Sequence, residues 1–363
     1  MNPNTRIPVS APDNTPLMPT LYRRAKAWVE SGKAAWVSND LNIKQVRLLN
    51  EPSSRNVQPV VVGIDPGKKF SGIAVQSSLF TLFTAHLILP FPNVTQKMTG
   101  RRILRRARRG RRINRKVAFK LRAHRQKRFD NRRQKKLPPS IRANRECEVR
   151  IVKELMRLFP VSTIVYEYIK AKGDKAFSPV MVGQRVMLGC LRQLATVVTQ
   201  FGWQTANLRN HLGLIKQKQN KAEQSPQTHA VDGIALASGQ FVEYRKYHRL
   251  GEDGAVWFGS VRLTPSPFRV IARPNLFRRQ LHFENFSKGG FRKRKGGTVT
   301  PFGFRSGDFV QAEKAGRVDK GWIGGFSEAS KVVSVYNHNW HRLGQFKANK
   351  VKLIKRSTKL CVA

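Results

Sequence analysis

The residues VVVGIDPG, numbers 60–67, decide the fold of this chain. A run of β-branched apolar residues predicts a buried strand, and the Pro-Gly pair that follows it predicts a turn. Asp65 therefore closes a strand of the protein interior. It is also the only acidic residue between Glu51 and Asp130, so its position in a basic chain is informative.

On both sides of this strand the pattern is typical of an α/β protein. Strands are expected at 70–76 and 79–89, joined as a hairpin, and at 163–166 and 203–208, with helices at 139–159, 181–201 and 226–238. This order fits a layered fold with a mixed sheet. Upstream, residues 1–20 are expected to wrap a surface, followed by a helix at 17–31 and strands at 34–38 and 43–49. Beyond residue 246, short alternating runs predict a small barrel or a pair of β modules.

The charge of the chain points to a polyanionic partner. Its 363 residues hold 69 Lys and Arg against 21 Asp and Glu, a formal charge of +48. A compact protein with this excess repels itself unless a partner such as nucleic acid neutralises it. The basic residues run through the whole chain, which excludes a basic tail on a neutral domain.

The densest basic segment is 97–136, where 20 of 40 residues are Lys or Arg and only Asp130 is acidic. A sparse apolar stripe of Ile113, Val117 and Leu121 predicts a long helix, with a break expected at Gly110. A basic helix can also be a solvated face. This one has no dry side for packing, and we therefore expect it to bind phosphates.

The cysteine spacing argues against a protein stabilised by zinc or disulfides, and the N-terminal residues and hydropathy argue against a secreted or membrane-spanning one. Cys147, Cys190 and Cys361 are far apart and form no CxxC pair, which argues against a zinc site and a disulfide framework. The N-terminus lacks a signal pattern, and the apolar stretch 79–91 is too short to span a bilayer. We expect a soluble, intracellular protein.

Four side chains are candidates for chemistry: Asp65, Glu167, His229 and Asp232. Glu167 closes the strand in STIVYEYI, where a buried carboxylate is costly unless it is paired or binds metal. His229 and Asp232, in THAVDGIALA, are three residues apart and share a helix face. Each has a plain structural alternative: a turn Asp, a carboxylate at a water-facing edge, and a His and Asp at a helix N-terminus.

Considered together, these alternatives weaken, because three carboxylates and a His lie on core elements of a chain poor in acid. Hard oxygen ligands suit Mg²⁺ or Mn²⁺. Two such ions can activate a water and stabilise the leaving oxygen of a phosphodiester. Without the ions, the acidic cluster would repel a DNA backbone.

The ordered motifs resemble a known family. GIDPG, a Glu that closes a strand, and HAVDG resemble the three split motifs of RuvC-like nucleases with the RNase H fold. The Arg-rich segment resembles the bridge helix of RNA-guided nucleases related to CRISPR type II effectors. The residues PLMP, numbers 16–19, and the C-terminal residues from TVTPFGF to KVKLI resemble transposon-encoded IscB and IsrB proteins. The resemblance covers nearly the whole chain.

IscB proteins carry an HNH nuclease between the second and third RuvC motifs. Here 64 residues separate Glu167 from Asp232, without an Asp-His pair or a cysteine knuckle, and this favours IsrB. The string HNWH at 338–341 has no acidic ligand motif nearby, and we interpret it as structural. By the resemblance, Asp65, Glu167 and Asp232 would bind two Mg²⁺ ions, with Mn²⁺ as an alternative, and His229 would be a further ligand or would orient the attacking water.

The resemblance also implies the partners: a guide (omega) RNA and a double-stranded DNA target with a short adjacent motif. The protein would be a monomer in a ribonucleoprotein of the prokaryotic cytoplasm, associated with the nucleoid when bound to DNA, and not with a membrane. The loop 288–297, KGGFRKRKGG, is a linker or an RNA contact. The side chains expected to bind nucleic acid are Arg101, Arg102, Arg105, Arg106, Arg108, Arg109, Arg111, Arg112, Arg115, Arg122, Arg125, Arg292 and Arg294.

The expected organisation has six parts. They are an N-terminal module at 1–56, RuvC-like parts at 57–93, 138–175 and 176–246, a bridge helix at 94–137, and a C-terminal β-rich region at 247–363 that contacts RNA and the adjacent motif. Two other functions stay open: a stand-alone, structure-specific RuvC-like endonuclease, and a non-catalytic RNA-binding regulator. A copurifying RNA would separate the first from the RNA-guided enzyme, and a metal-dependent nicking assay would decide the second.

Overall fold

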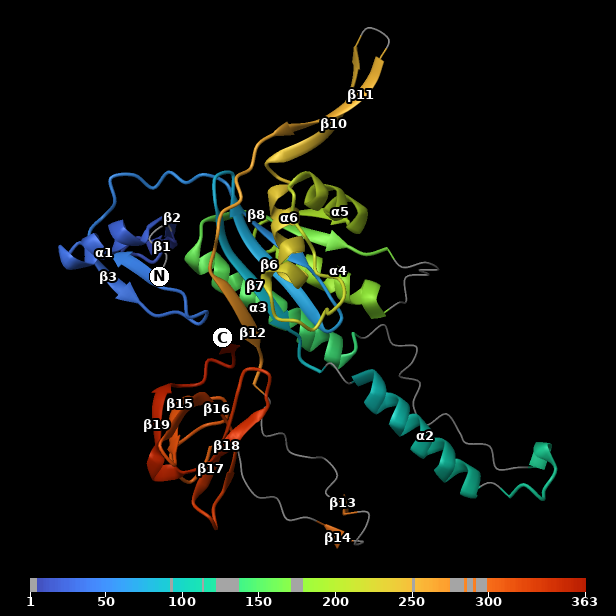
Figure 1. Cartoon of the computed structure of the whole chain (residues 1–363). Helices are drawn as coiled ribbons and strands as arrows, with labels where there is room; N and C mark the ends of the chain where they lie inside the picture. Colours follow the sequence, from blue (N-terminus) through green and yellow to red (C-terminus); the bar gives the residue numbers. More distant parts are fainter. Residues whose placement is uncertain are drawn as a thin grey trace.

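The computed structural model describes residues 5–91, 94–112, 114–121, 137–170, 179–249, 252–274, 284–285, 290–291 and 299–363. Its centre is a seven-stranded sheet in the order β20-β12-β7-β6-β5-β8-β9 (Figure 1). The strands are β5 (Val60–Asp65), β6 (Phe70–Ser77), β7 (Thr81–Ile88), β8 (Val161–Tyr168), β9 (Thr196–Phe201), β12 (Phe268–Ala272) and β20 (Cys361–Val362). β5 pairs antiparallel with β6 and parallel with β8. The predicted α/β class with a mixed sheet is confirmed.

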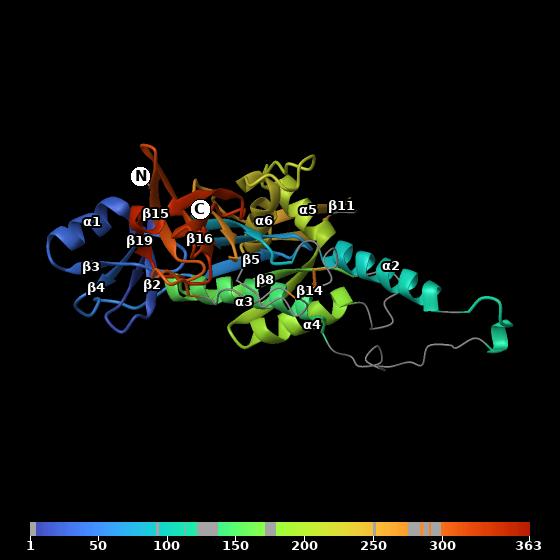
Figure 2. The same cartoon turned by 90° about the horizontal axis from the view of Figure 1, so that it is seen from below.

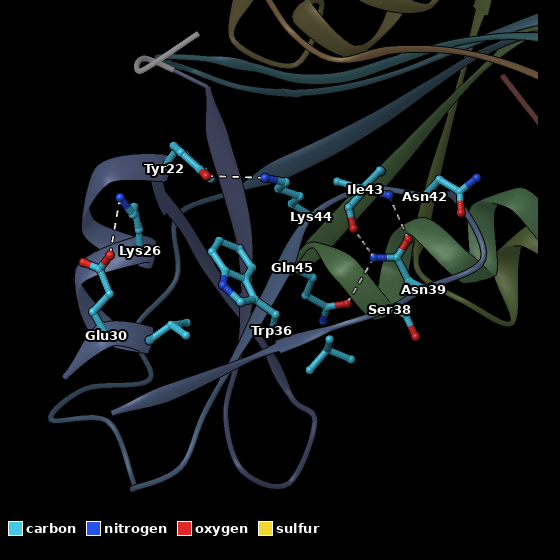
Figure 3. A pocket seen from close by; sticks show the side chains of 12 residues that line it. Tyr22, Lys26, Glu30, Trp36, Ser38, Asn39, Asn42, Ile43, Lys44 and Gln45 are labelled. Atoms are coloured by element: carbon cyan, nitrogen blue, oxygen red, sulfur yellow. Dashed lines mark hydrogen bonds and ion pairs between the residues drawn. The ribbon is translucent and has the colours of Figure 1, made fainter. Parts of the chain in front are cut away.

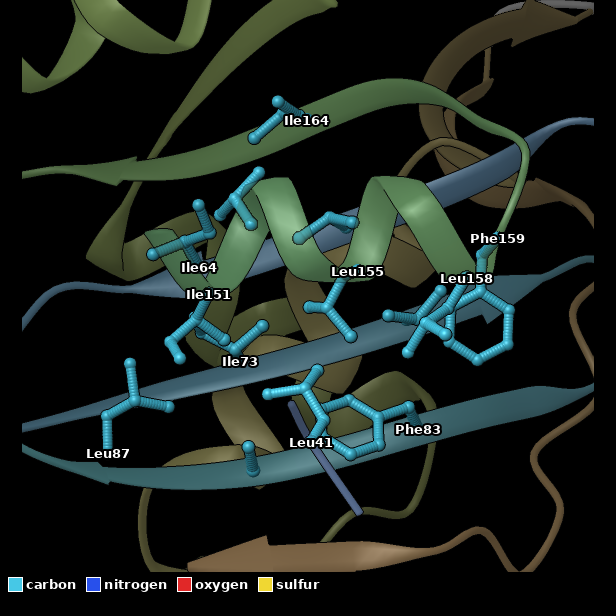
Figure 4. Packing of buried hydrophobic residues seen from close by; sticks show 14 of the residues in the cluster. Leu41, Ile64, Ile73, Phe83, Leu87, Ile151, Leu155, Leu158, Phe159 and Ile164 are labelled. Carbon is cyan, nitrogen blue, oxygen red and sulfur yellow. The ribbon is translucent and has the colours of Figure 1, made fainter. Parts of the chain in front are cut away.

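Helices cover both faces of this sheet. On one face lie α3 (Pro139–Leu158) and α4 (Pro179–Arg192); on the other lie α5 (Gly202–His211) and α6 (Val231–Ser238), the latter preceded by the π-helical turn η2 (Pro226–Ala230). Under α3, Ile151 and Leu155 pack against Ile64 and Ile73 of the sheet (Figure 4). Burial of each such side chain contributes about 1.5–3 kcal/mol, so the α3 face supplies the main core.

Two sequence predictions next to this core are wrong. Residues 181–201 are not one helix, because α4 ends at Arg192 and β9 follows. The run of Thr and Val at 196–199 favours a strand, and β9 extends the sheet in parallel with β8. The expected strand at 203–208 is instead helix α5, whose start is capped by the Gln204 side chain, which accepts from the Phe201 N–H at 2.8 Å.

The N-terminal module has its own sheet, in the order β2-β1-β4-β3. Its elements are β1 (Arg6–Ser10), β2 (Pro16–Leu21), α1 (Tyr22–Glu30), β3 (Ala34–Val37) and β4 (Gln45–Leu48). The prediction that residues 1–20 wrap a surface is wrong, since Ile7 and Val9 are buried. Strand β2 was not predicted because it contains two prolines, which are unfavourable within a sheet. They are tolerated because β2 is an edge strand.

The C-terminal part is rich in β structure, as predicted. A hairpin of β10 (Val242–Arg249) and β11 (Glu252–Gly259) projects from the body (Figure 1). A five-stranded antiparallel sheet follows, made of β15 (Phe309–Lys314), β16 (Arg317–Ser327), β17 (Val332–Tyr336), β18 (Arg342–Lys347) and β19 (Val351–Lys355), with the short elements β13 (Glu284–Asn285), β14 (Gly290–Phe291) and η3 (Ala348–Lys350). The sequence did not indicate that β12 and β20 return to the central sheet.

The basic segment forms α2 (Val94–Arg112), which extends away from the sheet in both views (Figures 1 and 2). The helix passes through Gly110 without the expected break and is shorter than predicted. Residues 114–121 form turns and the 3₁₀ turn η1 (Phe119–Leu121). The Asn114 side chain accepts from the Lys116 N–H at 3.0 Å, a local bond that competes with helix. The rest of the predicted helix, 122–136, lies outside the described residues.

All three cysteines are free thiols, as expected. Among the described residues, none of the helices is both long and apolar enough to cross a membrane.

Candidate active site

Strand alternation places two of the predicted carboxylates on the same face of the sheet. Val61 of β5 and Val165 of β8 pack against α6, whereas Ile64 packs against the α3 side. Side chains two residues apart in a strand share a face, so Asp65 and Glu167 point to the α6 side. Because β5 and β8 are parallel neighbours, both carboxylates emerge at the same end of the sheet.

Glycines allow the third motif to reach this face. A Cβ on Gly63 would overlap the carbonyl oxygen of Gly233, and a Cβ on Gly72 would overlap that of His229. The backbones of β5 and β6 therefore touch η2 and α6 directly. Gly72 is the ladder partner of Asp65. The contact at Gly72 consequently brings His229 beside Asp65.

His229 and Asp65 face each other at the centre of the site. Nδ1 of His229 lies 3.6 Å from Oδ2 of Asp65, and both side chains are largely buried. Nε2 of His229 lies 3.0 Å from the Lys221 carbonyl oxygen, which can only accept, so in the neutral imidazole Nε2 carries the proton. Nδ1 then presents a lone pair towards a carboxylate oxygen, and among the described residues it has no hydrogen-bond partner.

Asp232 is the most buried acid of the set, at 2% exposure. Arg209 of α5 donates to its Oδ1 at 2.5 Å, and Lys216 donates to its Oδ2. Burial and the charge of Asp65 raise the pKa of Asp232, while Lys216 and Arg209 oppose that rise. The two cations therefore hold the carboxylate in place, and neither was predicted from the sequence.

Glu167 completes the acidic set from the end of β8. Burial raises its pKa to about 7, and the neighbouring charges of Asp65 and Asp232 push in the same direction. Thr205 of α5 opposes the shift through a hydrogen bond. The charges of Asp65 and Asp232 both act on Glu167, so the three carboxylates share one electrostatic environment.

The carboxylate oxygens and the imidazole nitrogen of this site are chemically suited to a divalent cation. The lone pair of His229 Nδ1 and the Asp65 carboxylate face each other without a donor between them, an arrangement that a cation would stabilise. Among the described residues, no three His, Cys, Asp or Glu side chains are grouped so that they could hold a metal ion as they stand. Arg209 and Lys216 occupy the oxygens of Asp232. The side chains of the site whose chemistry suits Mg²⁺ or Mn²⁺ are Asp65, Glu167, Asp232 and His229.

Behind Asp65 lies a buried network that sequence reasoning missed. Glu148 of α3 is fully buried and accepts from the Ser71 hydroxyl at 2.5 Å. Arg145 lies 3.0 Å from Glu148 and donates to the Gly67 carbonyl at 3.0 Å, while the Gly67 N–H donates to Ser71. Both polar groups of Gly67 are therefore held, which fixes the turn after Asp65. The sequence could have indicated this network, because Glu148 lies on the same helix face as the apolar Ile151 and Leu155.

A second missed residue is His86 of β7. It is buried, and burial, followed by the charge of His229, lowers its pKa to about 4. Thr228 donates its hydroxyl to the Ser225 carbonyl, so it accepts from Nδ1 of His86 at 3.2 Å. The ring of His86 meets that of His229 edge to face, with 5.2 Å between centroids. A neutral His86 therefore helps to orient His229.

Of the predicted nucleic-acid contacts, four have described side chains, and these lie on α2 and just after it. Arg101, Arg102 and Arg106 are exposed along α2 (Figure 2), and Arg115 lies in the turns that follow. The side chains of Arg105, Arg108, Arg109, Arg111 and Arg112, and all of Arg122, Arg125, Arg292, Arg294 and the loop 288–297 except β14, lie outside the described residues. His338 of the HNWH string donates to the Gln224 side chain at 2.7 Å.

Comparison with known proteins gives one family and distant structural neighbours. A family model described as RRXRR protein matches residues 7–185, slightly less than half of the chain. That stretch contains Asp65, Glu167 and the string RRARR at 105–109. No curated protein matches the chain.

Two solved structures of RuvC from Thermus thermophilus are similar in part. The complex with a Holliday junction substrate has a TM-score of 0.28 and 14% identity, over 50% of this chain and 90% of that one. The structure of RuvC alone has a TM-score of 0.27 and 14% identity, over 49% and 90%.

Proposed function

We propose that this protein is an RNA-guided DNA endonuclease of the IsrB type, which nicks the strand not paired to the guide. The observation that carries the proposal is the convergence of Asp65, Glu167, His229 and Asp232 from three separated segments on the α6 face of one sheet. The strand order β7-β6-β5-β8-β9, with β6 antiparallel, supports an RNase H-like (RuvC) fold.

The chemistry proposed is hydrolysis of a phosphodiester with two Mg²⁺ ions, or Mn²⁺, in place of a protein nucleophile. When bound, the ions supply Lewis acidity towards the scissile phosphate and make an attacking water more nucleophilic. Asp65, Glu167 and Asp232 would hold them. His229 Nδ1, unprotonated while Nε2 donates to Lys221, is oriented to serve as a ligand or to accept a proton from the water.

Arg209 and Lys216 have a second role in this proposal. They neutralise Asp232 in the free protein, so that the acidic cluster does not repel a DNA backbone. Both lie at the rim of the site, at 12% and 24% side-chain exposure. If Asp232 were to hold a metal ion, the charges of Arg209 and Lys216 would be available to bind the phosphates beside the scissile bond.

RNA guidance rests on the charge and on the family match. A formal charge of +48 and the exposed arginines of α2 suit an RNA and its heteroduplex with the target strand. The match to the RRXRR model spans this helix and the first two acidic motifs. In the proposed complex the C-terminal β region contacts RNA and reads the short motif beside the target, in the cytoplasm of a prokaryote.

The test combines single substitutions with strand-specific detection. Asp65→Asn should lower nicking of a supercoiled plasmid by on the order of 10³-fold or more, since several kcal/mol of transition-state stabilisation are lost. RNA binding should stay unchanged. Asp13→Asn, an acid in the N-terminal module paired with Arg55, is the control and should nick normally. Labelling each strand should locate the cut in the displaced strand.

The same assay separates the other functions. Cleavage of branched DNA without RNA would replace the proposal by a structure-specific endonuclease. Normal cleavage by Asp65→Asn would remove the site assignment, and tight RNA binding without metal-dependent nicking would indicate a regulator. Linear product at early times would show a second nuclease centre.

A further inference from the structure

The N-terminal module carries an open pocket that the nuclease reaction does not use. It has a volume of about 680 Å³, which lies in the range of ligand sites, and it is formed between α1 and the strands β3 and β4 (Figure 3). Two aromatic rings, from Tyr22 and Trp36, form one wall. Polar groups of Ser38, Asn42 and Gln45 form the opposite rim.

The aromatic wall is exposed although the module has an apolar core elsewhere. Trp36 is 42% exposed, and its ring lies 6.0 Å from that of Tyr22 with 31° between the planes. The core of the module has Ile7, Val9 and Val46 at its centre; Tyr22 packs against it, and Trp36 is not part of it. Trp36 is thus not needed to fill the interior, and a large part of its ring surface is open to solvent.

A cation stands over both rings. Nζ of Lys44 lies 4.9 Å from the centre of the Tyr22 ring and 5.7 Å from that of Trp36, and it donates to the Tyr22 hydroxyl at 3.4 Å (Figure 3). The one acid of the lining, Glu30, is paired with Lys26 at 3.3 Å. The charge at the aromatic wall is therefore positive, which disfavours a cationic ligand and favours an anion attached to a flat, apolar group.

The polar rim is held rigidly. The Asn39 side chain donates to the Ile43 carbonyl at 2.6 Å and accepts from the N–H groups of Leu41 and Ile43. Asn42, between them, adopts a left-handed backbone with φ of 51°, and its carbonyl accepts from Arg269 at 3.1 Å. A pre-formed rim lowers the ordering cost of binding.

We propose that this pocket binds an unpaired nucleobase of RNA, stacked on Trp36, with the adjoining phosphate against Lys44. A base presents a flat π-face to the ring, hydrogen-bonding edges to the amides of the rim, and an anion on its backbone. The module lies on the opposite side of the central sheet from α2 in both overall views (Figures 1 and 2), so it would hold a part of the RNA distant from the α2 contact. The choice of guide RNA as the occupant rests on the proposed function, whereas the base pocket itself does not.

The test uses the full chain and a short RNA probe of about four nucleotides, the lower limit for sites that stack successive bases. It is run at raised salt, where contacts that involve only phosphates weaken. Trp36→Leu should bind the probe about five- to hundredfold more weakly, as expected for the loss of one stacked base. Trp36→Phe should retain most of the affinity. An abasic probe should bind Trp36→Leu and the unchanged protein equally.

Two further variants separate the contribution of the Lys44 charge from that of the Trp36 ring. Lys44→Gln should weaken both the normal and the abasic probe, while Lys33→Gln, an exposed lysine of the same module outside the pocket, should weaken neither. A photoreactive uridine in the probe should crosslink to Trp36. Equal binding of the RNA probe by Trp36→Leu and the unchanged protein, crosslinks only at other residues, or tighter binding of a DNA probe with the same bases than of the RNA probe would each overturn the proposal. None of these readouts depends on nicking, so failure of the pocket and failure of the nuclease assignment remain distinguishable.

Discussion

The central strand β5 and the helix α2 show two opposite ways in which this chain uses its residues. In β5, Val60, Val62 and Ile64 have no exposed surface. In α2, Met98 is 50%, Ile103 59% and Leu104 61% exposed, and arginines surround them. Burial stabilises β5 at about 25 cal/mol for each Å² removed from water, whereas closely spaced like charges destabilise α2.

The difference implies a division of labour. The active-site side chains are fixed by contacts within the chain: glycine-mediated backbone contacts, the network behind Gly67, and the cations on Asp232. The α2 arm gains little from the rest of the chain and would be neutralised by a nucleic acid. Changes in the sheet should therefore alter folding and chemistry, and changes in α2 should alter binding alone.

The largest effect is expected where the sheet meets α6. Gly63→Val would force a side chain into the carbonyl of Gly233, so we expect loss of the native fold or a stability loss beyond about 4 kcal/mol, the range of severe core damage. Soluble yield and thermal unfolding followed by circular dichroism measure it. Gly189→Ala is the matched control, because a Cβ there meets nothing within 4 Å; it should be neutral or slightly stabilising. Comparable losses in both variants would refute the close-contact argument.

A smaller effect is expected in the network behind Asp65. Arg145→Met leaves the buried Glu148 without its ion-pair partner, which should cost about 3–5 kcal/mol above neutral pH. The double variant Arg145→Met with Glu148→Gln should recover much of that loss, since no buried charge remains. Denaturant unfolding of the three proteins gives the values. If the double variant were as unstable as the single one, packing of Arg145 and not its charge would be the cause.

The α2 arm should show the reverse behaviour. Replacing Arg101 and Arg102 by Gln should lower the salt dependence of RNA binding by a slope of about 1–2, roughly one phosphate contact for each charge. The thermal unfolding temperature of the free protein should not change. The matched pair Lys153→Gln and Arg157→Gln, exposed on α3, should leave the slope unchanged. A loss of stability in the α2 variant would show that the arm packs on the protein.

The same contrast explains how far the sequence could predict the structure. Strands β5, β6, β7 and β8 were predicted because their apolar runs are long and end in turns, and α3 because Pro139 starts it. Segments 181–201 and 203–208 were misassigned because short apolar runs fit a helix and a strand equally well. There the outcome depends on β9 pairing with β8, a tertiary contact that is absent from local sequence.

Sequence patterns could single out the acidic residues of the candidate site but not the residues that pair with them. Scarcity of acid singled out Asp65, Glu167 and Asp232, because each such carboxylate is costly to bury. Arg209 and Lys216 could not be singled out in a chain with 69 Lys and Arg. Glu148 could have been, since it lies on the buried face of an amphipathic helix, where an acid requires a partner.

The smallest effect concerns the pH dependence of stability. It tests the buried network beside the central sheet directly. Burial raises the pKa of Glu148 from 4.5 to about 7, against the opposing pull of Arg145 and Ser71. Between these values the folded chain keeps the proton while the unfolded chain has released it. The unfolded state then binds fewer protons, so stability falls as pH rises. The contribution of Glu148 is fully present below pH 4.5 and is lost as pH rises through about 7.

Glu148→Gln cannot titrate, so the unfolding temperature of the unchanged protein should fall relative to that of this variant as pH rises from 4.5 to about 7, the window that follows from the shift. Glu154 lies on the same helix and is paired with the exposed Arg157. The unfolding temperature of Glu154→Gln should therefore change with pH in parallel with that of the unchanged protein. Parallel curves for Glu148→Gln as well would mean that the ion pair with Arg145 keeps Glu148 ionised when folded. Asp65 would then stand in front of a buried, charged pair of Arg145 and Glu148.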